Sequence, residues 1–252
     1  MRLVSAFSTL LLASASLVSA TESRVSYSAS AFALDGDDLL YVERHVETLR
    51  EGRLAEREVR YEDPRGELIA AKLVRYGESP LAPSFAMTDF RIGLREGAEV
   101  ESGEVVLFSG PLEERDRGRS VKRPQVAVID AGFDAYMREN FGEIAKGRNL
   151  EFDFAVPAVG RFFKFRLVPQ GRVEYQGEEA LSVKMKPANR LLRLLVDPID
   201  LVYGLDGRLL EFRGLSNVCD EEGDRYKARI VFDYSEEKRP VAVATVAERS
   251  AP

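Results

Sequence analysis

The sequence predicts an α+β protein: a curved antiparallel β-sheet, forming a half-barrel, with one main helix packed on its concave side. Three observations support this prediction. Short apolar segments are separated by turns that contain Gly, or Pro with Gly. Within several segments apolar and polar residues alternate, as in strands with one buried face. Residues 131–146 instead place apolar side chains three and four positions apart, as in an amphipathic helix.

The N-terminus predicts a signal peptide over residues 1–20. Arg2 precedes an apolar run, and Ser19 and Ala20 are small residues of the kind that signal peptidase recognises. We expect cleavage after Ala20 and a periplasmic or secreted protein. A retained anchor is less favoured, because the run is short for a bilayer span and is interrupted by serines. No later segment is apolar enough to span a membrane, so we expect no integral membrane protein after cleavage.

The rest of the chain predicts one half-barrel-like domain over residues 21–237, followed by a tail or last strand over residues 238–252. The net charge is −6. An acidic balance disfavours nucleic acid as a partner, because phosphate binding needs a basic face. The sequence names no protein partner and no oligomeric state.

Residues 26–76 predict a meander of strands at 40–50, 54–61 and 67–76. Charged residues are dense here, and we expect them to pair across the strands on a solvated outer face. His45 lies among them and is expected at the surface. The charged residues concerned are Glu43, Arg44, Glu47, Arg50, Arg53, Glu56, Arg57, Glu58 and Arg60.

Three more strands are predicted before the helix, at residues 85–94, 105–109 and 125–129. Residues 110–124 carry charges of both signs between two prolines and predict an exposed loop.

The helix at residues 131–146 has one apolar side. Asp130 is expected as its N-cap, and Asp134 is expected to pair with Arg138 one turn later. Because a single short helix is marginal alone, this one needs a partner surface, which we expect to be the apolar face of the sheet. Its apolar residues are Phe133, Tyr136, Met137, Phe141 and Ile144.

Clean alternation follows the helix and predicts strands that each have one apolar face. Residues 189–196 suit a short helix or a buried strand equally. Turn signals precede further strands at residues 209–212 and 225–234. The apolar faces consist of Phe152 and Phe154; of Phe163, Phe165 and Leu167; and of Leu181, Val183 and Met185.

Two stretches, VIDAGFDAYMRENFGEIAKGRNLEFDFAVP from residue 128 and DPIDLVYGLDGRLLEFRGLSNV from residue 197, resemble an uncharacterised family of secreted bacterial proteins. They cover about a fifth of the chain. By architecture and export alone, the wider pattern resembles the half-barrel periplasmic lipoprotein carriers of the Lol system. That resemblance implies a curved antiparallel sheet with a helix inside and a pocket for lipid. No functional residue carries over, because no motif of the carriers is matched.

The sequence assigns no catalytic residues, no metal site and no cofactor. His45 and Cys219 are the only residues of their types, and the usual zinc and Ser-His-Asp sites need more. Cys219 is expected to be a buried, unreactive thiol. The segments 35–38 and 220–224 are expected to be acidic turns. Carboxylate pairs at Asp130–Asp134 or Glu151–Asp153 keep a hydrolase as the least favoured hypothesis.

The favoured hypothesis is an exported, non-enzymatic protein that binds or carries an apolar, lipid-like ligand in the half-barrel. The alternative is a cell-envelope structural or interaction protein with a filled core. Whether the concave side is hollow or filled stays open. The residues predicted to line the ligand site are Phe133, Tyr136, Met137, Phe141, Phe152, Phe154, Phe163 and Phe165.

Overall fold

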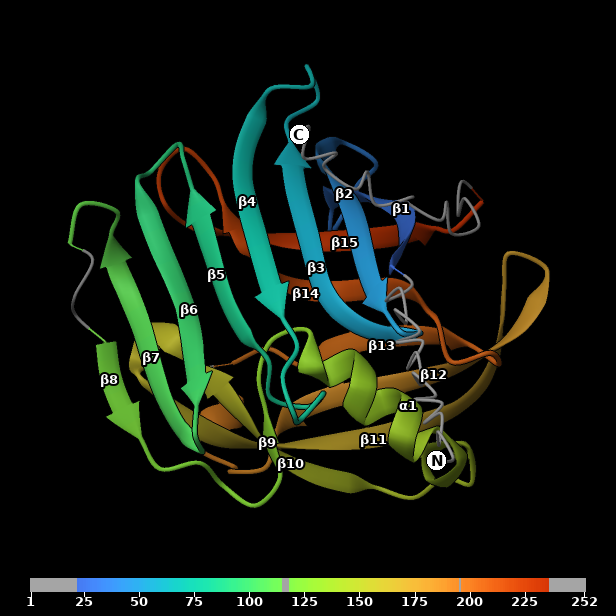
Figure 1. Cartoon of the computed structure of the whole chain (residues 1–252). Helices are drawn as coiled ribbons and strands as arrows, with labels where there is room; N and C mark the ends of the chain where they lie inside the picture. Colours follow the sequence, from blue (N-terminus) through green and yellow to red (C-terminus); the bar gives the residue numbers. More distant parts are fainter. Residues whose placement is uncertain (1–21, 115–117, 195, 236–252) are drawn as a thin grey trace, which may run out of the picture.

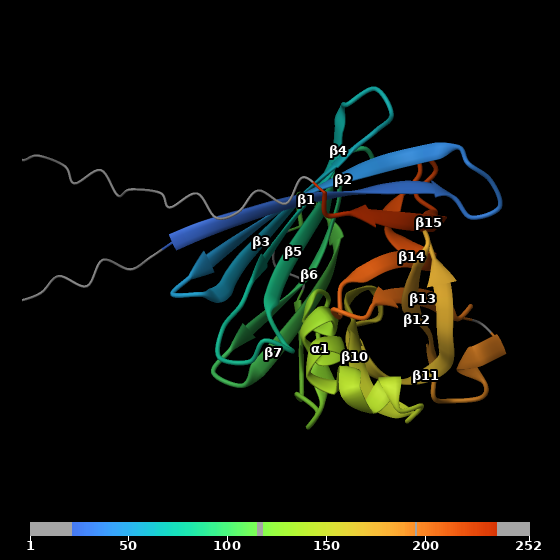
Figure 2. The same ribbon diagram turned by 90° about the vertical axis from the view of Figure 1, so that its right-hand side faces the viewer.

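The strands form one antiparallel meander that folds over on itself. The computed structural model describes residues 22–114, 118–194 and 196–235, and its strands make a single 15-stranded sheet in the order β8-β7-β6-β5-β4-β3-β2-β1-β15-β14-β13-β12-β11-β10-β9. Only β9 and β10 pair in parallel. In Figures 1 and 2 the strands β2 to β8 form one wall, the strands β10 to β14 form the opposite wall, and helix α1 lies between them at one end.

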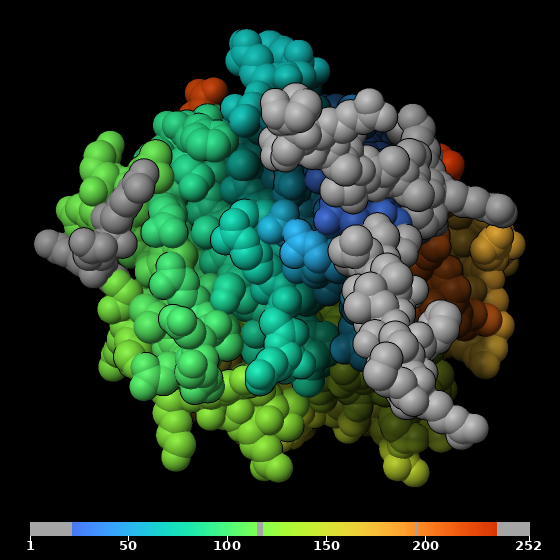
Figure 3. All heavy atoms as spheres, viewed as in Figure 1, coloured from blue at the N-terminus to red at the C-terminus, as the bar shows by residue number. Residues whose placement is uncertain are grey.

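The first wall is built from β1 (Glu22–Ala33), β2 (Leu39–Arg50), β3 (Arg53–Glu62), β4 (Leu68–Arg75), β5 (Ser84–Asp89), β6 (Leu94–Glu101), β7 (Glu104–Pro111) and β8 (Gly118–Val121). The second wall is built from β9 (Ala127–Val128), β10 (Leu150–Val156), β11 (Arg161–Tyr175), β12 (Glu178–Pro187), β13 (Ile199–Gly204), β14 (Leu209–Cys219) and β15 (Arg225–Asp233). Helix α1 is Gly132–Ala145, and 3-10 turns lie at η1 (Pro157–Val159) and η2 (Leu192–Leu194). The outer face of the first wall shows no deep hollow over β4 to β7 in Figure 3.

This architecture confirms the predicted fold class, a curved antiparallel sheet with one main helix inside it. Two local predictions were wrong. The expected strand at residues 85–94 ends at Asp89, and a tight turn leads into the unpredicted strand β6. The expected loop at residues 110–124 contains strand β8, which extends the edge of the sheet beside β7. Within residues 189–194, expected to belong to a short helix or a buried strand, the structure has the short 3-10 helix η2, and Leu191 and Leu194 are exposed. The predicted signal peptide and the segment 238–252 lie outside the described residues.

Helix α1 packs on the second wall as predicted. Met137 and Ile144 are fully buried, and the Tyr136 ring lies 4.9 Å from the ring of Phe152. The Tyr136 hydroxyl donates a hydrogen bond to the backbone carbonyl of Glu151 on β10. The layer between the helix and β10 to β13 is therefore filled by side chains. Its buried members are Val128, Tyr136, Met137, Ile144, Phe152, Phe165, Leu167, Leu181, Val183, Met185, Leu201 and Tyr203.

The helix begins differently from the sequence prediction. Ala131 occupies the N-cap position, and no side chain caps the helix. Asp130 has a positive φ of 42° and accepts a hydrogen bond from Lys72 Nζ on β4 at 3.1 Å. Asp134 accepts one from Arg57 Nη1 on β3 at 2.6 Å, instead of pairing with Arg138. Both aspartates therefore tie the start of the helix to the first wall, at the end where the helix dipole favours negative charge.

The charged strands were predicted to turn their charges outward, and for Glu43, Glu47 and Arg57 this was wrong. Glu43 and Arg57 are each 7% exposed and point to the interior, while their neighbours Arg44 and Glu58 are exposed. Alternate residues of a strand face opposite sides, so charges at consecutive positions must divide between the two faces. The charged side chains that point inward can be buried because they are paired.

A second polar cluster joins the walls away from the helix. Asp89 accepts a hydrogen bond from the backbone N–H of Cys219, and Arg91 donates to the carbonyl of Cys219. Arg225 on β15 donates to Glu96 on β6 at 2.6 Å. The walls therefore meet at two polar contacts that enclose the interior between them.

We expect Arg57→Ala to lower the free energy of unfolding by about 3–5 kcal/mol, because it leaves Glu47 and Asp134 buried without their cation. Urea denaturation followed by circular dichroism measures this. The control is Arg60→Ala on the same strand, where an exposed ion pair predicts a change within about 0.5 kcal/mol. Equal effects of the two variants would contradict the assigned role of Arg57.

The two helix glycines give a second matched pair. A Cβ on Gly132 would lie 2.0 Å from the backbone oxygen of Leu81, whereas a Cβ on Gly142 meets nothing within 4 Å. We expect Gly142→Ala to raise the free energy of unfolding by up to about 1 kcal/mol, since alanine favours helix. Gly132→Ala should instead lower it by forcing the helix away from the first wall. Thermal unfolding compares them, and a stabilised Gly132→Ala would refute the close approach.

Candidate functional site

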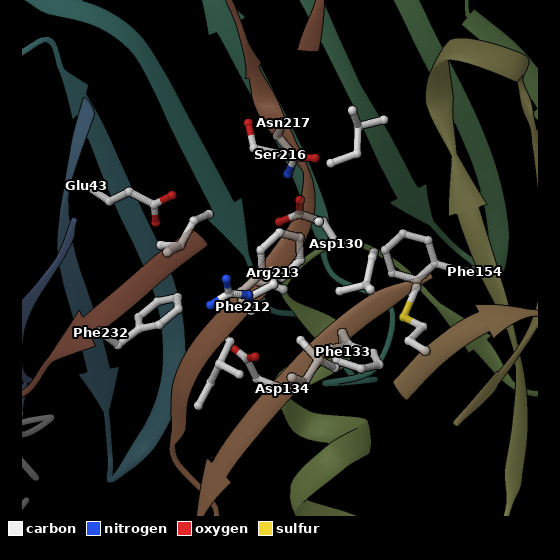
Figure 4. A pocket seen from close by; sticks show the side chains of 18 of the residues that line it. Glu43, Asp130, Phe133, Asp134, Phe154, Phe212, Arg213, Ser216, Asn217 and Phe232 are labelled. Atoms are coloured by element: carbon white, nitrogen blue, oxygen red, sulfur yellow. The ribbon is translucent and has the colours of Figure 1, made fainter. Parts of the chain in front are cut away.

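The interior between the walls contains a cavity of about 1110 Å³. This volume lies just above the range of about 300–1,000 Å³ for small-molecule sites. The start of α1, the inner faces of β2 to β4 and the strands β13 to β15 contribute to its lining. Figure 4 shows side chains from both walls and from the helix around it.

One side of the cavity is apolar. It consists of aromatic and aliphatic side chains from α1 and from the second wall, including β15. Most of these side chains also belong to the packed layer under the helix. Their periodicity follows from the alternation that the sequence shows in these strands. The apolar lining residues include Phe133, Phe154, Phe165, Met185, Ile199, Leu201, Leu209, Phe212 and Ile230.

The structure divides the eight residues predicted to line a ligand site. Phe133, Phe154 and Phe165 lie on the cavity wall. The other five are packed into the layer between helix and sheet and do not line the cavity. Tyr136, Met137 and Phe152 are buried there, and Phe141 and Phe163 are partly buried against them.

The opposite side of the cavity is polar, and the sequence analysis missed it. Glu43, His45 and Glu47 of β2 face inward together with Arg57 of β3 and Lys72 of β4. The signal was present as alternation: residues 43, 45 and 47 share one face of a strand. It was not decisive, because residue 44 is charged as well, so both faces of the strand look polar.

His45 was predicted at the surface and is buried, so that prediction was wrong. Its ring stacks on Tyr27 at 4.5 Å, and its Nε2 donates a hydrogen bond to Glu43 Oε2 at 2.8 Å. The stacking explains the error, because the sequence does not show that Tyr27 of β1 lies opposite His45 in the ladder.

Arg57 is the central cation of the polar side. Its Nη2 lies 2.6 Å from Glu47 Oε1, and its Nη1 lies 2.6 Å from Asp134 Oδ2. The guanidinium group thus bridges the first wall and the helix. Its buried position disfavours the charge, yet the surrounding carboxylates and phenols keep the pKa of Arg57 above its ordinary value.

The tyrosines around the cavity are held neutral. Burial raises the pKa of Tyr27, Tyr41, Tyr61 and Tyr203 well above 10, chiefly because a phenolate would be desolvated there. In the described part of the chain, the Tyr203 hydroxyl and His45 Nδ1 are buried without a hydrogen-bond partner. Such atoms are rare in folded proteins and call for an explanation.

Lining residues that are also exposed gather at two places, which form the openings of the cavity. At the first opening, the pairing of β13 with β14 ends at Asp200 and Arg213. Residues 196–198 and Leu215 line the cavity there and are exposed. An ion pair of 2.8 Å between Lys227 and Asp197 crosses it. Leu191 and Leu194, in the loop that leads to it, are 72% and 81% exposed.

The second opening lies where α1 passes the turn between β13 and β14. Arg138, Asp206 and Arg208 line the cavity there and are exposed.

The other candidate groups from the sequence have structural partners. Asp130 pairs with Lys72, Glu151 with Arg166 and Asp153 with Lys164. The two acidic segments form the predicted turns, and Asp220 caps its own by accepting two backbone hydrogen bonds.

Cys219 is buried as predicted, and burial raises the pKa of its thiol. Within residues 22–114, 118–194 and 196–235, no three His, Cys, Asp or Glu side chains are arranged to hold a metal ion. In the same residues no helix has the length and apolar character needed to cross a membrane.

Comparisons with known proteins gave matches only among solved structures; no protein-family model and no curated protein matches the chain. One is a β-barrel-like protein of the domain of unknown function DUF1849 from Brucella abortus, with a TM-score of 0.40 and 8% identity over 87% of this chain and 97% of that one. A DUF1329 family protein from Desulfovibrio piger gives 0.28 and 9%, over 91% and 89%. A putative outer membrane lipoprotein-sorting protein domain from Vibrio parahaemolyticus gives 0.27 and 9%, over 90% and 87%. Both classes named by the sequence resemblance, uncharacterised families and lipoprotein-sorting proteins, occur among these structures.

The neutral tyrosines predict a loss of stability in alkali. A tyrosine whose pKa is higher in the folded protein than in the unfolded protein contributes its full stabilisation below the unfolded pKa, near 10. This contribution is lost as the pH rises above the unfolded pKa. Each tyrosine held neutral should remove about 1.4 kcal/mol of unfolding free energy per pH unit above 10. Urea midpoints between pH 8 and 11.5 measure the slope. Tyr203→Phe, which deletes an unpartnered hydroxyl, should leave stability at pH 8 unchanged or higher and reduce the slope; an unchanged slope would contradict the assignment.

Proposed function

We propose that the protein is an exported, non-enzymatic binding protein that holds or carries an apolar, lipid-like ligand in its cavity. The observation that carries the proposal is the cavity itself: about 1110 Å³ of space with one side formed by aromatic and aliphatic side chains. Transferring an alkyl chain from water to such a wall is favourable by about 0.8 kcal/mol for each buried CH₂ group.

Binding is favoured over catalysis because four of the acidic side chains that line the cavity are already paired with cations. Glu47 and Asp134 share Arg57, Asp130 pairs with Lys72, and Glu96 pairs with Arg225. A carboxylate that acts as an acid or base needs a geometry open to its substrate. The predicted signal peptide supports a site of action outside the cytoplasm, in the periplasm or as a secreted protein.

The alternative, an envelope interaction protein with a filled core, has partial support in the packed layer under α1. That layer fills only the space between the helix and β10 to β13. The remaining volume, with openings at exposed lining residues, favours the ligand-binding proposal.

The test uses the neutral apolar dye N-phenyl-1-naphthylamine, whose fluorescence rises in an apolar environment. We expect saturable binding to the purified protein. Phe133→Ala should weaken it about tenfold, because losing a ring contact worth roughly 1.4 kcal/mol changes a dissociation constant by that factor. Phe141→Ala is the matched control: it lies on the same helix and is also partly buried, but does not line the cavity.

Native mass spectrometry of the protein purified without detergent is the second measurement. A co-purifying apolar molecule, displaced by the dye, supports the proposal. Absence of saturable dye binding, or equal weakening by the two phenylalanine variants, would overturn it.

A further inference from the structure

On the polar side of the cavity, carboxylates and aromatic rings line the wall together. We define the acidic recess as Tyr27, Glu43, His45, Glu47, Phe232 and Tyr234, all of which line the cavity. Figure 4 shows the Glu43 carboxylate and the Phe232 ring on this side, across the cavity from Phe133 and Phe154.

Negative charge exceeds positive charge at the recess. Arg57 is the cation nearest to it, and two carboxylates, Glu47 and Asp134, share that single guanidinium group. Glu43 has no arginine or lysine partner in the described part of the chain; its hydrogen bond comes from His45. A group that brought positive charge into the recess would therefore complete its charge balance.

Unpartnered polar atoms lie on the same cavity. His45 has a side chain that is 7% exposed, and its Nδ1 has no partner among the described residues. The hydroxyl of Tyr203, which is 1% exposed, also has none. Both residues line the cavity. Buried polar atoms usually find partners, so these two leave hydrogen-bonding capacity unused in residues of the cavity wall.

The rings of the recess pack on one another, and the Tyr27 hydroxyl donates a hydrogen bond to Glu47 at 3.4 Å. Tyr27 stacks on His45 at 4.5 Å and lies 5.0 Å from Tyr234, which in turn stacks with Phe232 at 6.3 Å. Arg208 already lies over the Tyr234 ring, 5.0 Å from its centroid. Aromatic faces attract cations, and ammonium groups are commonly held between such rings.

We infer that the cavity takes an amphiphile with a cationic head group, an ammonium on an apolar chain, its head in the acidic recess and its chain along the apolar side. This inference rests on the proposed function, since it names the ligand class of the same cavity. An anionic head group fits the recess less well, because Arg57, the cation nearest to it, is already paired with Glu47 and Asp134 at 2.6 Å.

The test compares two amphiphiles of equal chain length, dodecyltrimethylammonium and dodecanoate, by isothermal titration calorimetry below their micelle concentrations. We expect one dodecyltrimethylammonium per chain, bound at least tenfold more tightly than dodecanoate. This comparison uses the unaltered protein and does not depend on any variant folding.

The variant Glu43→Gln removes a charge while keeping an acceptor for His45, and it should reduce the preference for the cation about tenfold. The control Glu58→Gln removes the same charge from the exposed face of β3 and should leave the preference unchanged. Circular dichroism checks that both variants are folded. If both variants reduce cation binding equally, the effect is that of net charge and the inference is wrong.

The outcomes separate the two proposals. Equal binding of the two amphiphiles, or tighter binding of dodecanoate, overturns the cationic head group and leaves the apolar cavity standing. Binding of neither amphiphile, together with no saturable binding of the neutral dye, overturns the proposed function as well.

Discussion

The structure depends on how the curved sheet pairs the charged side chains that point to its interior. Arg57 on β3 is nearly enclosed, and it is held by Glu47 from the neighbouring strand and by Asp134 from the helix. A buried guanidinium group persists only when its hydrogen bonds are satisfied, so the helix and the first wall must meet at this point. The Lys72–Asp130 pair repeats the arrangement one strand further along. These contacts fix where α1 begins and how far the walls stand apart.

Filled and hollow regions follow from that spacing. A helix of 14 residues covers β10 to β13 through an apolar layer without solvent access, in which Met137 and Phe152 are fully buried. It is too short to fill the whole interior of a 15-stranded sheet, and the contacts of Asp89, Arg91 and Glu96 hold the far parts of the walls together. The remaining volume inherits an apolar side from the helix layer and β15 and a polar side from β2 to β4. An amphiphilic ligand is the class that matches such a division.

Much of the fold was predictable because local sequence patterns, turn residues and side-chain periodicity, indicate it. Strands β2, β3 and β4 and helix α1 begin and end close to the predicted residues, since turn residues and periodicity act over short distances. Strand β14, predicted at residues 209–212, extends to Cys219. The site was predicted less completely. Phe133, Phe154 and Phe165 line the cavity, but residues of identical pattern, such as Phe152 and Met137, lie in the packed layer.

The sequence by itself determined many of the elements, the apolar faces of strands after the helix and the apolar side of the helix, because side-chain period and turn chemistry are local properties. Only the tertiary structure decided which face of the charged strands turns inward. Residues 43 and 44 are both charged, so the choice depends on partners far along the chain: Tyr27 for His45, and Asp134 for Arg57. Burial of a charge is a property of the pair, and the pair forms only when the sheet closes around the helix.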